Sequence, residues 1–202
     1  FYLQGAGEPR KIRFHDYDEI FKFPGLYEQV FYDRLKCTSP VKVTSILETA
    51  ITQSSENFSE LRVLDLGAGN GILGLGCLLV GAQHVTLVEA DPLVVEIAKS
   101  NAERLSPRCE GTVQVIQEHI SLQSEQPEIV PDIVLMNPPW GVQTAKADRP
   151  LLEYAFSLGA PVVHVLHSAK SKHVQALGRD YGYESEAMLE TEFRLPPTYL
   201  HH

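Results

Sequence analysis

The sequence lacks long apolar runs, paired cysteines and an excess of positive charge, and each absence excludes a class of protein. No apolar run approaches the roughly 20 residues that a membrane helix requires, so a soluble globular protein is expected. The N-terminus lacks the basic start and apolar centre of a signal peptide. Cys37, Cys77 and Cys109 show no paired spacing, which argues against disulfides and a zinc site and favours a reducing, intracellular compartment.

The charge balance limits the kind of partner. The chain has 17 basic and 26 acidic residues and a formal net charge of -9. Binding to phosphate backbones normally depends on Lys and Arg that release counterions, so a nucleic-acid substrate would need a local basic patch or a partner. No metal site is predicted, because His164 and His167 stand three apart on a predicted strand and point to opposite faces.

Short β-branched runs alternate with helical patterns along most of the 202 residues. This pattern predicts an α/β fold with a doubly wound, mostly parallel sheet, whose ligand lies beyond the carboxyl ends of the strands. The predicted strands are residues 62–68, 84–90, 112–120, 132–138 and 161–167. The predicted helices are residues 71–81, 92–105, 149–159 and 171–182.

The two ends of the chain differ from this repeating core, which is taken as residues 59–202. Residues 1–13 are interpreted as a tag or flexible N-terminus. Residues 14–58 carry aromatics and leucines at helical spacings, which predicts an N-terminal helical cap over the carboxyl ends of the strands. Residues 183–195 have the pattern of a sixth strand, which should form a hairpin with another, so a final strand is expected to be missing.

The first chemical motif is "VLDLGAGNGILG", at the first turn from strand to helix. Gly67, Gly69 and Gly71 allow the backbone to approach a ligand where a Cβ atom would clash. Glu89 ends the second predicted strand about twenty residues later, where a carboxylate can accept both hydrogen bonds from a ribose diol. The motif therefore predicts a site for a nucleoside-containing cofactor.

Two cofactors fit this motif. Gly69, Gly71 and Gly74 satisfy the G-x-G-x-x-G pattern of a dinucleotide site. Asp65, inside the strand, favours the other cofactor, because "DLGAGNG" resembles the signature of class I S-adenosylmethionine methyltransferases. In that family the acidic residue helps to hold the methionine end of S-adenosyl-L-methionine, and S-adenosyl-L-homocysteine is the product.

The stretch "LMNPPWG" at the end of the fourth predicted strand places hydrogen-bond acceptors and an aromatic ring on the same rim as the glycine loop. An amide or arylamine nitrogen attacks a methyl group poorly unless its hydrogens are held and its lone pair is aimed. The Asn137 side-chain oxygen and the Pro138 carbonyl are two acceptors for one NH₂ group, while Pro138 and Pro139 fix φ and remove competing donors. Trp140 offers a face on which a flipped base can stack, worth roughly 1–3 kcal/mol.

"NPPW" resembles the [DNS]-P-P-[YFW] motif of amino-group methyltransferases, which act on glutamine, adenine N6, cytosine N4 or guanine N2. Residues 38–47, 162–174 and 193–202 narrow this choice, because they resemble the methyltransferase-like protein 5 family. Members of that family methylate adenine N6 in small-subunit ribosomal RNA. The resemblance implies substrate-side roles for Thr38, Trp140, His167, Lys170, Pro197 and Tyr199.

The resemblance also implies cofactor contacts and a partner. His119 stands where the family has an Asp that receives the adenine amine, with Glu118 beside it. The implied cofactor-binding residues are Asp65, Gly67, Gly69, Asn70, Gly71, Glu89, Ala90, Asp91, Glu118, His119 and Asn137. Family members pair with a small zinc-binding activator subunit through an edge strand, which corresponds to Thr112–His119 here.

The sequence thus predicts an S-adenosylmethionine-dependent N-methyltransferase acting on adenine N6 in small-subunit ribosomal RNA, in the cytoplasm and in the nucleus as well. Two alternatives stay open. Glutamine-N5 methylation of a release factor, as in HemK-type enzymes, agrees better with the acidic charge. A catalytically silent methyltransferase fold that works through its partner belongs to a different functional class.

Overall fold

The computed structural model describes residues 2–3, 10–12, 23, 26, 29, 45, 49, 58–138 and 148–190. The chain divides into two compact units, one formed by residues 1–41 and 191–202 and the other by residues 42–190. In the first unit, β1 (Tyr2–Leu3) and β2 (Arg10–Lys11) form an antiparallel pair. The second unit contains the large sheet. No helix among these residues is long and apolar enough to span a membrane.

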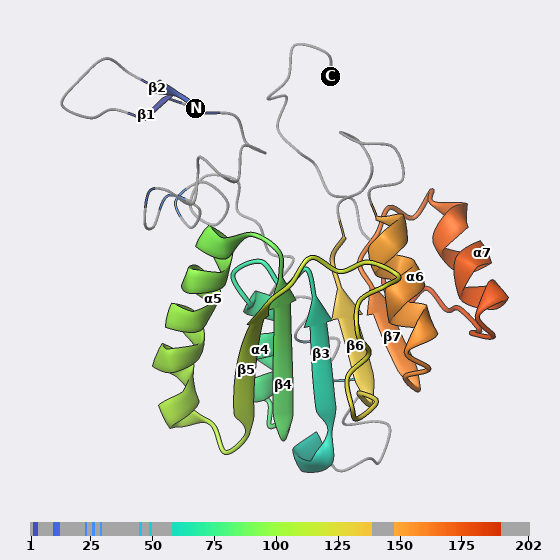
Figure 1. The fold of residues 1–202 in the computed structure, drawn as a ribbon, viewed down its shortest axis with the longest axis horizontal. Helices are drawn as coiled ribbons and strands as arrows, with labels where there is room; N and C mark the ends of the chain where they lie inside the picture. Colours follow the sequence, from blue (N-terminus) through green and yellow to red (C-terminus); the bar gives the residue numbers. More distant parts are fainter. Residues whose placement is uncertain are drawn as a thin grey trace. The chain divides into compact units, whose positions relative to one another are not determined.

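The large sheet has five parallel strands in the order β5-β4-β3-β6-β7 (Figure 1). The strands are β3 (Arg62–Leu66), β4 (His84–Glu89), β5 (Thr112–Gln117), β6 (Ile133–Met136) and β7 (Val162–Val165). The chain runs outward from β3 to β5 and then returns to β6 on the other side of β3. The predicted doubly wound α/β fold is confirmed, and its switch point lies between β3 and β6.

The four α-helices in the described part of the core fall where the sequence predicts them, and two short 3-10 helices add to them. They are α4 (Ile72–Leu79), α5 (Pro92–Leu105), α6 (Arg149–Ser157) and α7 (Lys172–Asp180), with the short 3-10 helices η2 (Phe58–Glu60) and η3 (Ser106–Arg108). Local chemistry fixes the start of α5, because the Asp91 side chain accepts a hydrogen bond from the Leu93 N–H at 2.8 Å. Pro92 follows as the first helical residue, where its missing N–H costs nothing.

Apolar side chains cover both faces of the sheet, as expected for parallel strands. On one face Val85 and Leu87 of β4 pack in a buried cluster with residues of α4 and α5, including Leu78 and Ala98. On the other face Leu64, Leu66, Val134 and Met136 pack in a second buried cluster with Leu152, Phe156 and other residues of α6. The two helical layers hold the strand ends in fixed positions.

The sequence prediction fails at one end of the core. Residues 183–190 form no strand. The Tyr183 hydroxyl donates to the Ala160 carbonyl at 2.8 Å and ties this point to the sheet, but residues 184–190 beyond it are exposed. Glu184, Glu186 and Glu190 keep this segment polar, and no described strand pairs with it. Residues 191–195, and nearly all of the predicted N-terminal cap, lie outside the described residues.

Candidate functional site

The glycine loop after β3 reaches across to the end of β4. The N–H groups of Gly67 and Ala68 both donate to the Val88 carbonyl, at 2.9 and 3.0 Å. Gly67, Gly69 and Gly71 have φ angles of 66°, 58° and 85°. Residues with a side chain rarely adopt this left-handed backbone conformation, so the path of the loop explains why glycines stand at these positions.

Glu89, at the end of β4, holds the glycine loop. One carboxylate oxygen accepts the Gly69 N–H at 2.8 Å. The other accepts the N–H groups of Ala90 at 2.8 Å and Asp91 at 3.0 Å. Each carboxylate oxygen has two acceptor sites, so the oxygen bonded to Gly69 retains capacity for a ligand hydroxyl. Glu89 therefore orders the loop as well as facing the site.

Asp65 lies fully buried in β3, directly beneath this loop. Its carboxylate accepts the Gly74 N–H at 2.8 Å. Burial raises the pKa of Asp65 to about 7, and the nearby charge of Glu89 raises it too, whereas the hydrogen bond from Gly74 lowers it. A cation bound above the loop would favour the ionised form of the Asp65 carboxylate. The amino group at the methionine end of S-adenosylmethionine is a cation of this kind.

The loop leaves space for a ligand. A Cβ atom added to Gly69 would meet nothing within 4 Å. Beneath the loop packing is close, because a Cβ atom on Gly74 would lie 2.4 Å from a Leu87 methyl carbon. The open side therefore faces the rim and the packed side faces the sheet. This open side could hold S-adenosylmethionine, with the Gly69 backbone and the Glu89 carboxylate as the groups available to it.

The remaining predicted cofactor residues lie in the glycine loop and directly after β4 and β5. Asn70 has structural contacts, because its side-chain oxygen accepts the Ile72 N–H at 3.3 Å and its carbonyl accepts the Asn101 amide at 3.0 Å. Asp91 uses its carboxylate to cap α5. Glu118, which is half-buried, and His119, which is exposed, directly follow β5. Glu118 is tied to the neighbouring strand end, because its N–H donates to the Glu89 carbonyl at 2.9 Å.

Asn137 lies at the switch point. Leu66 of β3 stands opposite Met136 of β6, so the glycine loop and Asn137 leave the sheet on adjacent strands. Asn137 is exposed, and its side chain makes no hydrogen bond to any residue in the described part of the chain. Its amide is therefore available to a substrate, while Pro138 behind it is buried. Pro139 and Trp140 lie outside the described residues.

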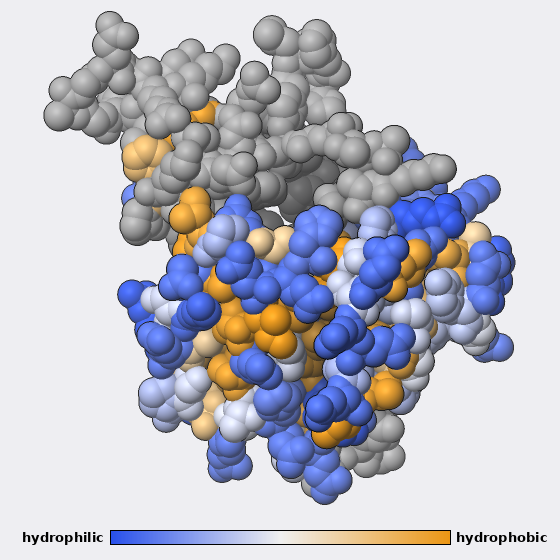
Figure 2. Space-filling view, viewed as in Figure 1, coloured by the Kyte–Doolittle hydropathy of each residue, from blue (hydrophilic) through white to orange (hydrophobic). Residues whose placement is uncertain are grey.

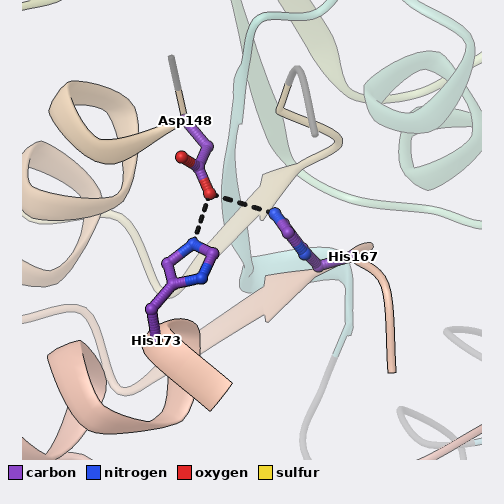
Figure 3. Close-up of side chains that lie close together, drawn as sticks. All are labelled: Asp148, His167 and His173. Atoms are coloured by element: carbon purple, nitrogen blue, oxygen red, sulfur yellow. Dashed lines mark hydrogen bonds and ion pairs between the residues drawn. The ribbon is translucent and has the colours of Figure 1, made fainter. Parts of the chain in front are cut away.

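His167 and Lys170 follow β7, on the same rim as Asn137. The Leu166 N–H donates to the Met136 carbonyl at 2.9 Å, which joins the two strand ends. Only 6% of the His167 side chain is exposed, and its Nε2 atom lies 3.0 Å from the Asp148 carboxylate (Figure 3). Lys170 is exposed. The other predicted substrate residues, Thr38, Pro197 and Tyr199, lie outside the described residues.

Asp148 and His173 join His167 in a contact that no sequence motif predicts. The Nε2 atom of His173 lies 2.5 Å from the carboxylate oxygen of Asp148 that His167 also contacts. One ligand atom from each of the three residues lies within 4.8 Å of the other two. Histidines six apart around a short turn are the only sequence signal, and Asp148 carries none. We call these three residues the Asp–His–His trio.

Comparisons with known proteins agree with this architecture. An uncharacterized protein of Methanocaldococcus jannaschii is 30% identical over 145 residues, which are 69% of this chain and 66% of that protein. The rRNA N(6)-adenosine-methyltransferase METTL5 of Danio rerio is 26% identical over 82% of this chain and 79% of its own length. A Pyrococcus horikoshii crystal structure, provisionally assigned as an RNA methyltransferase, has a TM-score of 0.57 and 32% identity.

The Pyrococcus alignment covers 70% of this chain and 65% of the other, so the chain spans about two thirds of two of these relatives. The family profile described as conserved hypothetical protein 95 matches residues 42–179, which contain the whole parallel sheet. The fold is that of class I methyltransferases. From the sheet, the glycine loop and this match together, the chain belongs to the conserved hypothetical protein 95 family.

Proposed function

We propose that this protein transfers a methyl group from S-adenosylmethionine to the N6 atom of an adenine in small-subunit ribosomal RNA. The observation that carries the proposal is the position of Asn137, exposed at the end of β6 beside the glycine loop of β3. The relative from Danio rerio bears the name of an rRNA adenosine methyltransferase, which supports this substrate. The name of a similar relative from Drosophila melanogaster supports it too.

The residues divide the work between cofactor and substrate. When bound, S-adenosylmethionine supplies an electrophilic methyl group on its sulfonium. Glu89 and the Gly69 backbone would hold the nucleoside, and Asp65 would face the methionine end. The Asn137 oxygen would accept a hydrogen bond from the adenine amine and orient the nitrogen lone pair. A strong general base is not required, because the amine becomes acidic once it carries the new methyl group.

A transfer assay with two acceptors tests the proposal. Purified protein would be incubated with tritium-labelled S-adenosylmethionine and either unmodified small-subunit ribosomal RNA or a release-factor protein. We expect label in the RNA, and N6-methyladenosine as the labelled nucleoside by mass spectrometry. Label in the release factor alone would replace the adenine proposal with glutamine methylation. No label in either acceptor, with cofactor binding intact, would favour a silent binding fold.

We also propose that a small zinc-binding subunit pairs with β5. Within the described residues β5 pairs with β4 alone and forms one edge of the sheet. An exposed edge offers unpaired backbone groups to a partner strand. Figure 2 shows hydrophobic residues gathered over the region of β5, β4 and β3 and bordered by hydrophilic ones, which supports an interaction surface there.

Amide exchange on the mixed proteins tests this pairing. With a zinc-loaded candidate subunit present, residues 112–117 should exchange their amide hydrogens at least tenfold more slowly. Residues 162–165 of β7, at the opposite edge, provide the comparison within the same sample. Equal exchange of residues 112–117 with and without a subunit that binds would exclude β5 as the contact.

A further inference from the structure

The Asp–His–His trio joins three elements beside the proposed site. Asp148 directly precedes α6, His167 follows β7, and His173 lies in the first turn of α7 (Figure 3). Both imidazole Nε2 atoms point to the same oxygen of Asp148, at 3.0 and 2.5 Å. Asp148 is 3% exposed, so its charge depends on these neighbours for stabilisation.

The hydrogen bonds determine which His167 nitrogen carries the proton. The backbone N–H of Ser168 donates to Nδ1 of His167 at 2.9 Å, so Nδ1 must offer a lone pair. Nε2 therefore carries the hydrogen and donates it to Asp148. A metal ligand would need the lone pair on Nε2 instead. This arrangement favours a hydrogen-bonded clamp over a metal site.

The pKa of Asp148 agrees with a carboxylate in this clamp. Burial raises this pKa, but the hydrogen bond and charge of His173 and the hydrogen bond of His167 lower it further than burial raises it. The net pKa lies below its ordinary value, so Asp148 is ionised near neutral pH.

The clamp closes the short loop between β7 and α7, which carries Lys170 and leads into Lys172, the first residue of α7. The Ser171 N–H donates to the Ser168 carbonyl at 2.9 Å, and the Lys170 N–H reaches the Ser168 hydroxyl at 3.4 Å. Lys170 and Lys172 are exposed and form no ion pair with any residue in the described part of the chain. Arg149, by contrast, pairs with Glu153 at 2.7 Å.

We propose that Asp148 is a positioning residue that clamps His167 and His173 and so holds Lys170 and Lys172 as an anchor for RNA phosphates. The inference rests on the proposed RNA substrate. The bond from Leu166 to Met136 keeps the loop beside the strand that carries Asn137, so the anchored phosphates would belong to nucleotides next to the target base. The chain has a net charge of -9, so it depends on few cations for RNA affinity. Two lysines held in place contribute more to that affinity than two mobile ones, because less freedom is lost on binding.

RNA affinity provides the first test, because it does not require methyl transfer. Binding of small-subunit ribosomal RNA would be measured by fluorescence anisotropy at several salt concentrations. Asp148→Asn should weaken binding about five- to tenfold and reduce its salt dependence, as should the double variant Lys170→Ala/Lys172→Ala. Asp180 is exposed at the other end of α7. Asp180→Asn makes the same change of net charge as Asp148→Asn and should leave RNA affinity within about twofold.

His173→Ala is a second variant that controls for misfolding. His173 is half exposed, and Asp148 keeps its contact with His167 when His173 is replaced. It should reproduce the weaker RNA binding at an unchanged melting temperature. In the transfer assay both variants should raise KM for RNA and leave kcat nearly unchanged, which a general loss of folded protein would not do. Unchanged affinity and KM in both variants would overturn the positioning role.

Two measurements on the protein without RNA distinguish the hydrogen-bonded clamp from a metal site. Nitrogen-15 NMR should show His167 with its hydrogen on Nε2 in the wild type and a tautomer mixture in Asp148→Asn. Calorimetry with Zn²⁺ alone should show no binding that depends on Asp148, and such binding would replace the clamp with a metal site. If RNA binds as expected but no adenine is methylated, the proposed reaction fails while the anchor stands. A wild type that binds no RNA would overturn the anchor.

Discussion

Gly69 donates its backbone N–H to the Glu89 carboxylate at 2.8 Å and so joins the glycine loop of β3 to the end of β4. The sequence predicts that Glu89 accepts hydrogen bonds from a ribose, but the structure gives it a second task. Both carboxylate oxygens already hold backbone N–H groups. In the proposed cofactor site, loop order and recognition of the ribose would therefore depend on the same side chain.

Replacement of Glu89 should weaken the cofactor site beyond the loss of one ribose contact. A hydrogen bond to a charged group contributes about 1.5–3 kcal/mol, so Glu89→Ala should lower affinity for S-adenosylhomocysteine about 10- to 100-fold. Glu89→Gln should lose less, because its amide oxygen can still accept the Gly69 N–H. Isothermal titration calorimetry measures both affinities. Equal affinity in wild type and Glu89→Ala would contradict this role.

Asp65→Asn should separate folding from cofactor binding. The folded-state pKa of Asp65 is raised to about 7, so the wild-type carboxyl favours folding most below its unfolded pKa near 4 and loses that contribution as pH rises to about 7. The asparagine oxygen can still accept the Gly74 N–H, without a buried charge. The free energy of unfolding of the variant should exceed that of the wild type by about 1 kcal/mol at pH 5, and this difference should rise to about 4 kcal/mol at pH 8.

Urea unfolding of both proteins across this pH range measures that gain, and their difference removes the contribution of other titrating groups. The same variant should bind S-adenosylhomocysteine more weakly at pH 8, because the ionised carboxylate is absent. A constant stability difference from pH 5 to 8 would show that Asp65 is ionised throughout in the folded state.

Gly69 of the glycine loop and Gly74 of α4 should respond differently to alanine. A Cβ atom on Gly74 would lie 2.4 Å from a Leu87 methyl carbon, so Gly74→Ala should cost about 1–3 kcal/mol of stability through overpacking. At Gly69 the space is open, but φ is 58°, so Gly69→Ala should cost about 1–2 kcal/mol through backbone strain. Gly69→Ala should also lower cofactor affinity. Urea unfolding and calorimetry on the two variants compare these effects, and a stable Gly74→Ala protein would contradict the packing.

Local signals account for the elements that the sequence predicts well. Asp91 and Pro92 stand at the start of α5, and this local pair is enough to predict where the helix begins. The glycine spacing alone predicts the loop after β3. The Asp–His–His trio has no such signal, because 25 residues separate Asp148 from His173 and only the packing of α6, β7 and α7 brings them together. The strand expected at residues 183–195 does not form over its described part, 183–190, for a related reason, since no strand in the described part of the chain pairs with it.

Asn137→Ala tests the division between cofactor and substrate most directly. The side chain is exposed and makes no hydrogen bond within the described residues, so its loss should change the melting temperature by no more than about 2 °C. Affinity for S-adenosylhomocysteine should stay within about threefold, because the glycine loop and Glu89 are untouched. Methyl transfer should fall at least 100-fold, since the amine loses an orienting acceptor. Collapse of cofactor binding together with transfer would show that Asn137 holds the cofactor rather than the substrate.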